Sequence, residues 1–157
     1  MCALARNDID TWECIMTKIL FVCHGNICRS PMAEFVMKDL AAKAGIGDQV
    51  QIASAATSRE ELGNPVYPPA RRELASHGLR CDGKFARQIT QADLSAYDRI
   101  YYMDSRNLRN LRMMFPGFDG FLPFLPRDVA DPWYSGDFTQ TWADICEGCN
   151  RILEELL

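Results

Sequence analysis

The sequence has no apolar run that approaches the roughly 20 residues needed to cross a bilayer. Its opening residues, MCALARNDIDTWECI, are too polar for the apolar core of a signal peptide. An excess of positive charge is also absent, because 17 Lys and Arg stand against 21 Asp and Glu, for a formal net charge of −4. Non-specific nucleic-acid binding draws on a basic face. These absences therefore argue against membrane and nucleic-acid partners.

Internal repeats and low-complexity segments are absent as well. The 157 residues are 48% hydrophobic and 24% charged, which is typical of one soluble globular domain and not of a disordered chain or a coiled coil. The seven cysteines are an odd number, in a chain larger than the small disulfide-rich scaffolds. We therefore expect a cytoplasmic protein whose cysteines are free thiols.

The beginning of the chain differs from the rest. Residues 1–15 show little periodicity, and we expect them to form an extension outside the core, with the domain over residues 16–157. The alternative is an amphipathic cap that uses Ile9, Trp12 and Ile15.

From residue 18 the chain alternates between strand and helix patterns. The continuous apolar run at 19–22 predicts a strand covered on both faces. Ser30 suits the N-cap of the helix that follows, Pro31 its first turn, and Gly45 its end. The other expected elements are strands at 50–53, 99–103 and 120–124, helices at 69–76, 107–114 and 138–156, and a loop at 126–136. This order predicts a single-domain α/β fold with a four-stranded parallel sheet and helices on both faces.

The segment CHGNICRSP, residues 23–31, joins the first strand to the first helix. A tight loop that enters a helix aims its backbone N–H groups at one point, where the helix dipole adds partial positive charge. Gly25 and Asn26 tolerate the positive φ that such a loop needs. Arg29 can hold two oxygens of a tetrahedral dianion. The same field favours the thiolate of Cys23, so the loop predicts a phosphate site with a nucleophile beneath it.

The spacing of this cysteine and arginine occurs twice in the chain. The second copy runs from Cys81 to Arg87, follows no apolar strand, carries Asp82 beside its cysteine and lacks the serine. In the first copy, Ser30 is placed to donate a hydrogen bond to the Cys23 sulfur. Only the first copy has the structural context that phosphate binding needs.

The segment CHGNICRSPMAE resembles the phosphate-binding loop of the low-molecular-weight protein tyrosine phosphatases. Further motifs match in order: Ser54-Ala55-Ala56-Thr57, Ala86-Arg87-Gln88, Met103-Asp104 and Asp131-Pro132-Trp133-Tyr134. The resemblance covers residues 17–157. It implies hydrolysis of phosphotyrosine proteins or small aryl phosphates through a cysteinyl-phosphate intermediate, with no cofactor and no metal, because the loop and arginine supply the positive charge. Phosphate and other oxyanions would inhibit, and we expect a monomer or weak dimer.

The resemblance also implies a role for each site residue. Cys23 would attack phosphorus, Arg29 would hold the equatorial oxygens, and Asp131 would protonate the leaving phenol and then activate water. Ser54 would support the loop from behind, and Cys28 would trap oxidised Cys23 as a disulfide, unless it is simply a small buried residue. The residues implied to bind the phosphate or wall the pocket are His24, Gly25, Asn26, Ile27, Cys28, Ser30, Trp133 and Tyr134.

The chain departs from the pattern of this family in two places. Lys84-Phe85 stands where many members carry a histidine, so we expect the polar network behind Asn26 to be rebuilt. Trp133-Tyr134 stands where some relatives have two tyrosines or an arginine. Ile27 occupies a position where members acting on phosphoarginine tend to carry threonine, which favours phosphotyrosine.

Two other functions remain as alternatives. An arsenate reductase shares this loop and fold but needs further thiols close to it, and we expect Cys81, Cys146 and Cys149 elsewhere, with Cys149 packed in the core. A phosphate-binding module without turnover is disfavoured by the complete set of catalytic residues. Asp128 is a second candidate acid, which we expect to be solvated.

Overall fold

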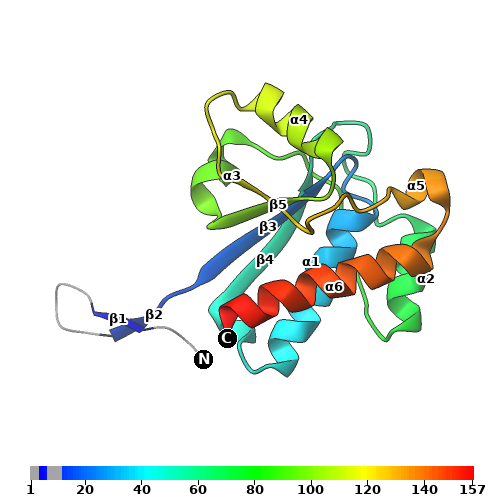
Figure 1. The fold of residues 1–157 in the computed structure, drawn as a ribbon. Helices are drawn as coiled ribbons and strands as arrows, with labels where there is room; N and C mark the ends of the chain where they lie inside the picture. The colour runs from blue at the N-terminus through cyan, green and yellow to red at the C-terminus, as the bar shows by residue number, and fades with distance from the viewer. Residues whose placement is uncertain (1–3, 7–11) are drawn as a thin grey trace.

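The computed structural model of the protein describes residues 4–6 and 12–157, and its centre is a parallel four-stranded sheet (Figure 1). The strands lie in the order β4-β3-β5-β6, and every neighbouring pair is parallel. Their bounds are β3 Thr17–Cys23, β4 Val50–Ala56, β5 Arg99–Tyr102 and β6 Phe121–Pro123. The predicted four-stranded parallel sheet is confirmed.

Helices cover both faces of this sheet, as predicted. They are α1 (Arg29–Lys43), α2 (Pro68–Ser76), α3 (Gln91–Ala96), α4 (Ser105–Met114), α5 (Pro132–Ser135) and α6 (Phe138–Leu156), with a short 3-10 helix η1 (Gly47–Gln49). The helices α1, α2 and α6 pack on one face, and α3 and α4 pack on the other (Figure 1).

The central strand β3 explains why its sequence is apolar without alternation. Ile19 and Phe21 belong to the core beneath α1 and α6, whereas Leu20 and Val22 belong to the core beneath α4. All four side chains are fully buried. A strand covered on both faces has no position for a solvated side chain, so the polar residues Thr17 and Lys18 lie only at its half-buried start.

The start of α1 differs from the prediction. The helix begins at Arg29, its N-cap is Cys28, and no side chain caps it. Ser30 is therefore not the N-cap. Its hydroxyl instead accepts a hydrogen bond from Asn26 and lies 3.0 Å from the Cys23 sulfur. The Ser30 hydroxyl therefore bonds with tertiary partners in the loop and does not cap the helix.

Other element boundaries also differ from the sequence analysis. The helix α4 begins at Ser105 and not at 107, because Asp104 accepts a hydrogen bond from the Asn107 backbone N–H and caps it. The short helix α3 follows the capping residue Thr90 and was not predicted. The expected loop 126–136 contains the single-turn helix α5. The helices α3 and α5, with six and four residues, are too short to show an apolar period.

The described part of the N-terminal segment forms a two-stranded antiparallel sheet from β1 (Leu4–Arg6) and β2 (Trp12–Cys14). The alternative of an amphipathic cap rests partly on Ile9, which lies outside the described residues. No helix in the described part of the chain is long and apolar enough to span a bilayer.

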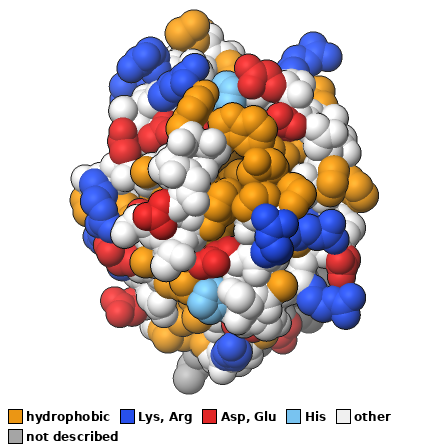
Figure 2. Space-filling model, turned by 90° about the vertical axis from the view of Figure 1, so that its right-hand side faces the viewer, with side chains coloured by type: hydrophobic (Ala, Val, Ile, Leu, Met, Phe, Trp, Pro, Cys, Tyr) orange, Lys and Arg blue, Asp and Glu red, His pale blue; other side chains and the backbone are white. Residues whose placement is uncertain are grey.

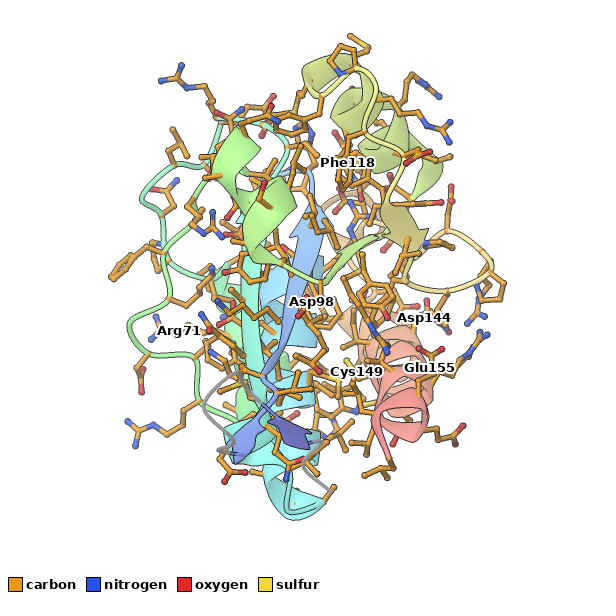
Figure 3. All side chains as sticks on the ribbon, turned by 90° about the vertical axis from the view of Figure 1, so that its left-hand side faces the viewer. Arg71, Asp98, Phe118, Asp144, Cys149 and Glu155 are labelled. Carbon is orange, nitrogen blue, oxygen red and sulfur yellow. The ribbon has the colours of Figure 1, made fainter. Side chains whose placement is uncertain are left out.

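The last helix, α6, packs along α1. Asp137 caps it by accepting a hydrogen bond from the Gln140 backbone N–H. Ile145, Cys149 and Ile152 recur on its buried face. The Cys149 thiol reaches the Ala33 carbonyl of α1 at 3.5 Å, so the prediction that Cys149 packs in the core is confirmed (Figure 3).

Candidate active site

A pocket opens where β3 ends and its loop turns into α1. In the sheet, β3 lies between β4 and β5, so the chain leaves the carboxyl end of β3 with a strand on either side. Such a position is where open parallel sheets bind ligands. The pocket is lined by Cys23, His24, Gly25, Ile27, Cys28, Arg29, Glu60, Glu61, Asp131, Trp133 and Tyr134.

The Cys23 thiol lies at the base of this pocket. The residue is only 3% exposed, and its sulfur lies 3.0 Å from the Ser30 hydroxyl. Ser30 is completely buried in the first turn of α1. A hydroxyl at this distance can donate a hydrogen bond to a thiolate, and the N-terminal turn of the helix adds favourable partial charge.

Asn26 gives the loop its shape. It is the non-glycine residue with positive φ, at 59°, among those the structure describes. Its carbonyl oxygen accepts a hydrogen bond from the Arg87 backbone N–H at 3.2 Å. Its amide nitrogen donates to the Ser30 hydroxyl at 2.8 Å and to the Ser54 hydroxyl at 2.9 Å. These three contacts hold a backbone conformation that is otherwise unfavourable for a residue with a side chain.

Arg29 is buried behind the loop, with 2% exposure. Its Nη1 donates to the Asp104 carboxylate at 2.6 Å and to the Val129 carbonyl at 2.8 Å. Its Nη2 donates to the Asp131 carboxylate at 3.4 Å. Burial alone would lower the pKa of Arg29, but the nearby Cys23 and the Asp104 carboxylate raise the pKa above its ordinary value. The guanidinium is therefore a fixed positive charge beside the sulfur.

Asp131 reaches the pocket from the other end of the chain. It is the N-cap of α5: its Oδ1 accepts a hydrogen bond from the Trp133 backbone N–H at 3.0 Å, and Pro132 follows at the first helical position. The other carboxylate oxygen faces Arg29. The Asp-Pro sequence thus orients an acidic side chain toward the cysteine loop.

Two exposed aromatic residues wall the pocket entrance. Trp133 is 52% and Tyr134 76% exposed, and the Trp133 ring lies 4.8 Å from the Tyr67 ring, centroid to centroid. Figure 2 shows the face of the molecule that carries α2 and α5, on which hydrophobic side chains gather beside acidic and basic ones. This surface suits an aromatic ring attached to an anionic group.

Cys28 lines the same pocket as Cys23 but has a different environment. Burial raises the pKa of the Cys28 thiol strongly, and the nearby Cys23 and Asp131 raise it further. Cys28 is therefore protonated at neutral pH. The remaining described thiols, Cys81, Cys146 and Cys149, do not line the pocket.

The opposite rim carries acidic residues that the sequence analysis missed. The His24 Nε2 lies 3.0 Å from a carboxylate oxygen of Glu60. A Cβ added to Gly25 would lie 3.3 Å from Cγ of Glu61, so the glycine lets this loop approach closely. Glu60 and Glu61 form an acidic pair after the second strand, and this pair was the feature of the sequence that could have indicated the rim. The distance of the pair from the cysteine loop is set by tertiary structure.

Asp104 was recognised as part of a matching motif but given no role. Its position at the end of β5, directly beside β3, was a usable signal, since carboxyl ends of neighbouring parallel strands meet at one edge. Asp128, by contrast, is exposed and accepts hydrogen bonds from Ser105, as its expected solvation predicted. Among the side chains that the structure describes, no group of three or more His, Cys, Asp or Glu residues could hold a metal ion.

Fold and site together define the class: the protein is a phosphate-ester hydrolase with an α/β fold, and its site is built around a cysteine loop. Comparison with known proteins gives the family. The family described as "Low molecular weight phosphotyrosine protein phosphatase" matches residues 18–157. The Bacillus subtilis (strain 168) protein "Low molecular weight protein-tyrosine-phosphatase YfkJ" is 38% identical over 150 residues, which are 90% of this chain and 96% of that protein.

Solved structures agree with this match. The crystal structure of YfkJ from Bacillus subtilis superposes with a TM-score of 0.86 at 37% identity, covering 90% of this chain and 94% of that one. The low molecular weight protein tyrosine phosphatase SP-PTP from Streptococcus pyogenes gives 0.84 at 40% identity, with coverage of 90% and 94%. The chain therefore belongs to the low molecular weight phosphotyrosine protein phosphatase family. This confirms the resemblance seen in the sequence and does not favour an arsenate reductase.

Proposed function

We propose that this protein hydrolyses phosphotyrosine in proteins, and small aryl phosphates, in two steps that use Cys23 as nucleophile. One observation carries the proposal: the Cys23 thiol, the Arg29 guanidinium and the Asp131 carboxylate line a single pocket. An anion-binding loop, a buried cation and an acid that is 24% exposed are what phosphoryl transfer to sulfur requires.

In the first step the loop N–H groups and Arg29 hold the oxygens of the phosphoryl group. The Cys23 thiolate attacks phosphorus, so that an S–P bond forms while the bond from phosphorus to the phenolic oxygen breaks. Asp131 enters this step protonated and gives its proton to the departing oxygen. The products are a tyrosine hydroxyl and a cysteinyl phosphate.

In the second step Asp131, now a carboxylate, takes a proton from a water molecule as that water attacks phosphorus. The S–P bond breaks, and inorganic phosphate leaves. The hydrogen bond from Ser30 stabilises the returning thiolate at 3.0 Å. Phosphate, as product, competes for the same loop, which supports the expected inhibition by phosphate and other oxyanions.

Pocket depth supports phosphotyrosine over phosphoserine. The nucleophile is 3% exposed at the base, whereas Trp133 and Tyr134 stand at the rim. A phosphate carried on a phenyl ring can reach the sulfur while its ring contacts these side chains, whereas the short side chain of phosphoserine would bring the peptide backbone into the rim. Ile27, which is 8% exposed, adds an apolar wall.

Three further assignments accompany this proposal. We infer that Cys28 can form a disulfide with oxidised Cys23, supported by their shared pocket. A reducing cytoplasmic setting is supported by the five free thiols among the described cysteines. The assignment of residues 1–15 as an extension of a domain over residues 16–157 is supported by the family match, which begins at residue 18. A monomer or weak dimer stays a prediction.

The decisive experiment compares peptides of one sequence that carry phosphotyrosine, phosphoserine or phosphoarginine. We expect phosphate release from the phosphotyrosine peptide to exceed the others by about 100-fold or more in kcat/KM. Rapid acid quenching during turnover should leave one phosphoryl group on the peptide that contains Cys23, detected by mass spectrometry. Faster release from phosphoarginine would contradict the substrate assignment. Phosphate binding without any release would instead indicate a binding module.

A further inference from the structure

An ion pair lies buried behind the loop, outside the pocket. Glu34 on α1 is 4% exposed, and the side chain of Lys84 is 12% exposed. The Lys84 ammonium lies 3.4 Å from Glu34 Oε1 and donates to the Ser54 carbonyl at 2.9 Å. Lys38, whose side chain is 45% exposed, contacts the other carboxylate oxygen at 2.7 Å. The desolvation of a buried ion pair offsets its attraction, so such a pair is weak evidence for a stabilising role.

Glu34 begins a line of hydrogen bonds that leads to the site. The Ser54 hydroxyl donates to Glu34 Oε1 at 2.6 Å. Since a hydroxyl has only one hydrogen, Ser54 must accept the contact from the Asn26 amide nitrogen at 2.9 Å. The direction of the bond between Asn26 and Ser54 is therefore set by the carboxylate.

The same reasoning continues to the sulfur. The Asn26 carbonyl oxygen faces the Arg87 backbone N–H, which can only donate, so the amide cannot be flipped without loss. Its second N–H donates to the Ser30 hydroxyl at 2.8 Å. Ser30 thus accepts from Asn26, and its own hydrogen is free for the Cys23 sulfur at 3.0 Å, which is closer than the Ala55 carbonyl at 3.5 Å.

We propose that Lys84 is a positioning residue for catalysis, because with Glu34 it fixes the direction of these hydrogen bonds so that Ser30 donates to the Cys23 sulfur. This inference rests on the proposed function and adds to it a residue pair that never touches the substrate. Glu34 is the anion at one end of the line, and the Cys23 thiolate is the anion at the other. The two Asn26 N–H groups donate toward both ends.

Lys84 contributes by holding the Glu34 carboxylate in place as the acceptor of the Ser54 hydrogen bond. A Glu34 side chain without this partner could rotate, and the rotation would free Ser54 to donate elsewhere. Burial lowers the pKa of Lys84, while the Glu34 carboxylate beside it acts in the opposite direction. The ion pair is thereby mutually supporting.

A simple through-space charge effect makes a different prediction, and the two can be separated. Under that alternative, Lys84→Met removes a positive charge and disfavours the thiolate, whereas Glu34→Gln removes a negative charge and favours it. If bond direction matters, both variants disfavour the thiolate, because a glutamine amide can donate to Ser54 and reverse the line. Glu34→Gln is therefore the informative variant.

The experiment measures three quantities on the full chain: the pH midpoint of Cys23 alkylation by iodoacetamide, kcat and KM for p-nitrophenyl phosphate, and the melting temperature. We expect Lys84→Met and Glu34→Gln each to raise the alkylation midpoint by about 0.5–1 pH unit. We expect kcat to fall about 3- to 10-fold with KM within about twofold, because the lost hydrogen bond is to the reacting sulfur. Lys84→Arg should keep the alkylation midpoint and kcat close to those of the wild type.

Lys43→Met is the matched control. Lys43 lies at the end of α1, its side chain is 73% exposed, and it pairs with Asp39. Its replacement removes the same charge far from the line of hydrogen bonds and should leave both values unchanged. The charged groups that face the sulfur, Arg29, Asp131, Glu60 and Glu61, are identical in all variants.

The double variant Lys84→Met with Glu34→Gln guards against misfolding, because it leaves no unpaired buried charge. It should melt closer to the wild type than either single variant, yet keep the raised midpoint. A midpoint that is unchanged or lowered in folded Glu34→Gln or in the double variant would overturn the proposal. If the wild type itself fails to hydrolyse phosphotyrosine, the proposed function fails instead, and the alkylation midpoints still test the positioning role.

Discussion

Cys23 and Cys149 are both buried cysteines in contact with α1, and they have opposite environments. Cys23 is 3% exposed beside the Ser30 hydroxyl and near the Arg29 guanidinium. Cys149 is fully buried between α6 and α1, where burial and then the nearby Cys146 raise the pKa of its thiol well above the ordinary value. Burial by itself therefore does not decide whether a thiol can react. What decides is which groups replace the water.

The helix α1 shows how one element serves both regions. Its first turn buries polar residues, Arg29 and Ser30, which are completely engaged with the loop and its neighbours. Its next turns bury Met32, Val36 and Met37 in the core. Cys23 contacts the polar first turn of α1, whereas Cys149 contacts the helix beyond that turn, where apolar residues are buried alongside Glu34.

The largest effect should come from replacing the reactive thiol. Cys23→Ser removes the nucleophile while keeping the loop, so turnover of p-nitrophenyl phosphate should fall by at least about 10⁴-fold. Phosphate binding, measured by calorimetry, should survive, because the N–H groups and Arg29 remain. Undiminished turnover would show that Cys23 is not the nucleophile, and Cys23 and Cys149 would then not differ in reactivity as proposed.

The next effect tests the acid that serves Cys23. Asp131→Ala should lower kcat for phosphotyrosine by about 10²- to 10³-fold, because the phenol must then leave without a proton. Esters of more acidic phenols should lose less, since their phenolates leave unaided. The measurement is kcat against leaving-group acidity for both proteins, and a parallel loss across the whole series would contradict the acid role.

Cys28 is intermediate between Cys23 and Cys149, because it lines the pocket but its thiol is protonated. Cys28→Ser should lower turnover by less than about tenfold, because the protonated Cys28 thiol supplies no charge to the reaction. After treatment with hydrogen peroxide, dithiothreitol should restore activity to the wild type but much less to the variant, whose Cys23 oxidises beyond recovery. Equal recovery in both proteins would exclude the proposed disulfide.

The smallest effect on activity, but a clear one on stability, is expected at Cys149. Cys149→Ala should leave turnover unchanged and lower the free energy of unfolding by about 1 kcal/mol at pH 7. Thiols of an unfolded chain ionise near pH 8.5, whereas burial raises the pKa of Cys149 in the folded protein. The unfolded state therefore loses this proton first, and wild-type stability falls as pH rises above about 8.5.

The variant lacks this thiol, so its deficit relative to the wild type should shrink between pH 8 and 10, by up to about 1.4 kcal/mol per pH unit. Urea unfolding at a series of pH values measures it. A deficit that stays constant with pH would mean that Cys149 ionises as readily in the folded protein as in the unfolded chain.

The sequence predicted the parts of the site that local chemistry determines. The apolar run of β3 was sufficient to identify a strand covered on both faces, and the spacing of the loop was sufficient for the position of Cys23, because both depend on neighbours along the chain. Ser30 was correctly placed beside the Cys23 sulfur, but it was also assigned to the helix cap, and its hydrogen bond with Asn26 in the folded loop was not predicted. Lys84 was expected to alter the polar network behind Asn26, but its pairing with Glu34 was missed, since 50 positions of sequence separate two side chains that meet only in three dimensions.

Arg29 has a consequence for the whole molecule. Through its guanidinium, the start of α1 is fastened to the Val129 carbonyl, 100 positions further along the chain. A fragment that stops short of this carbonyl would retain the cysteine and its loop but lack the anchor that orients the cation. Enzymatic activity should therefore appear only once the entire polypeptide has folded, which makes turnover itself a reporter of completed folding.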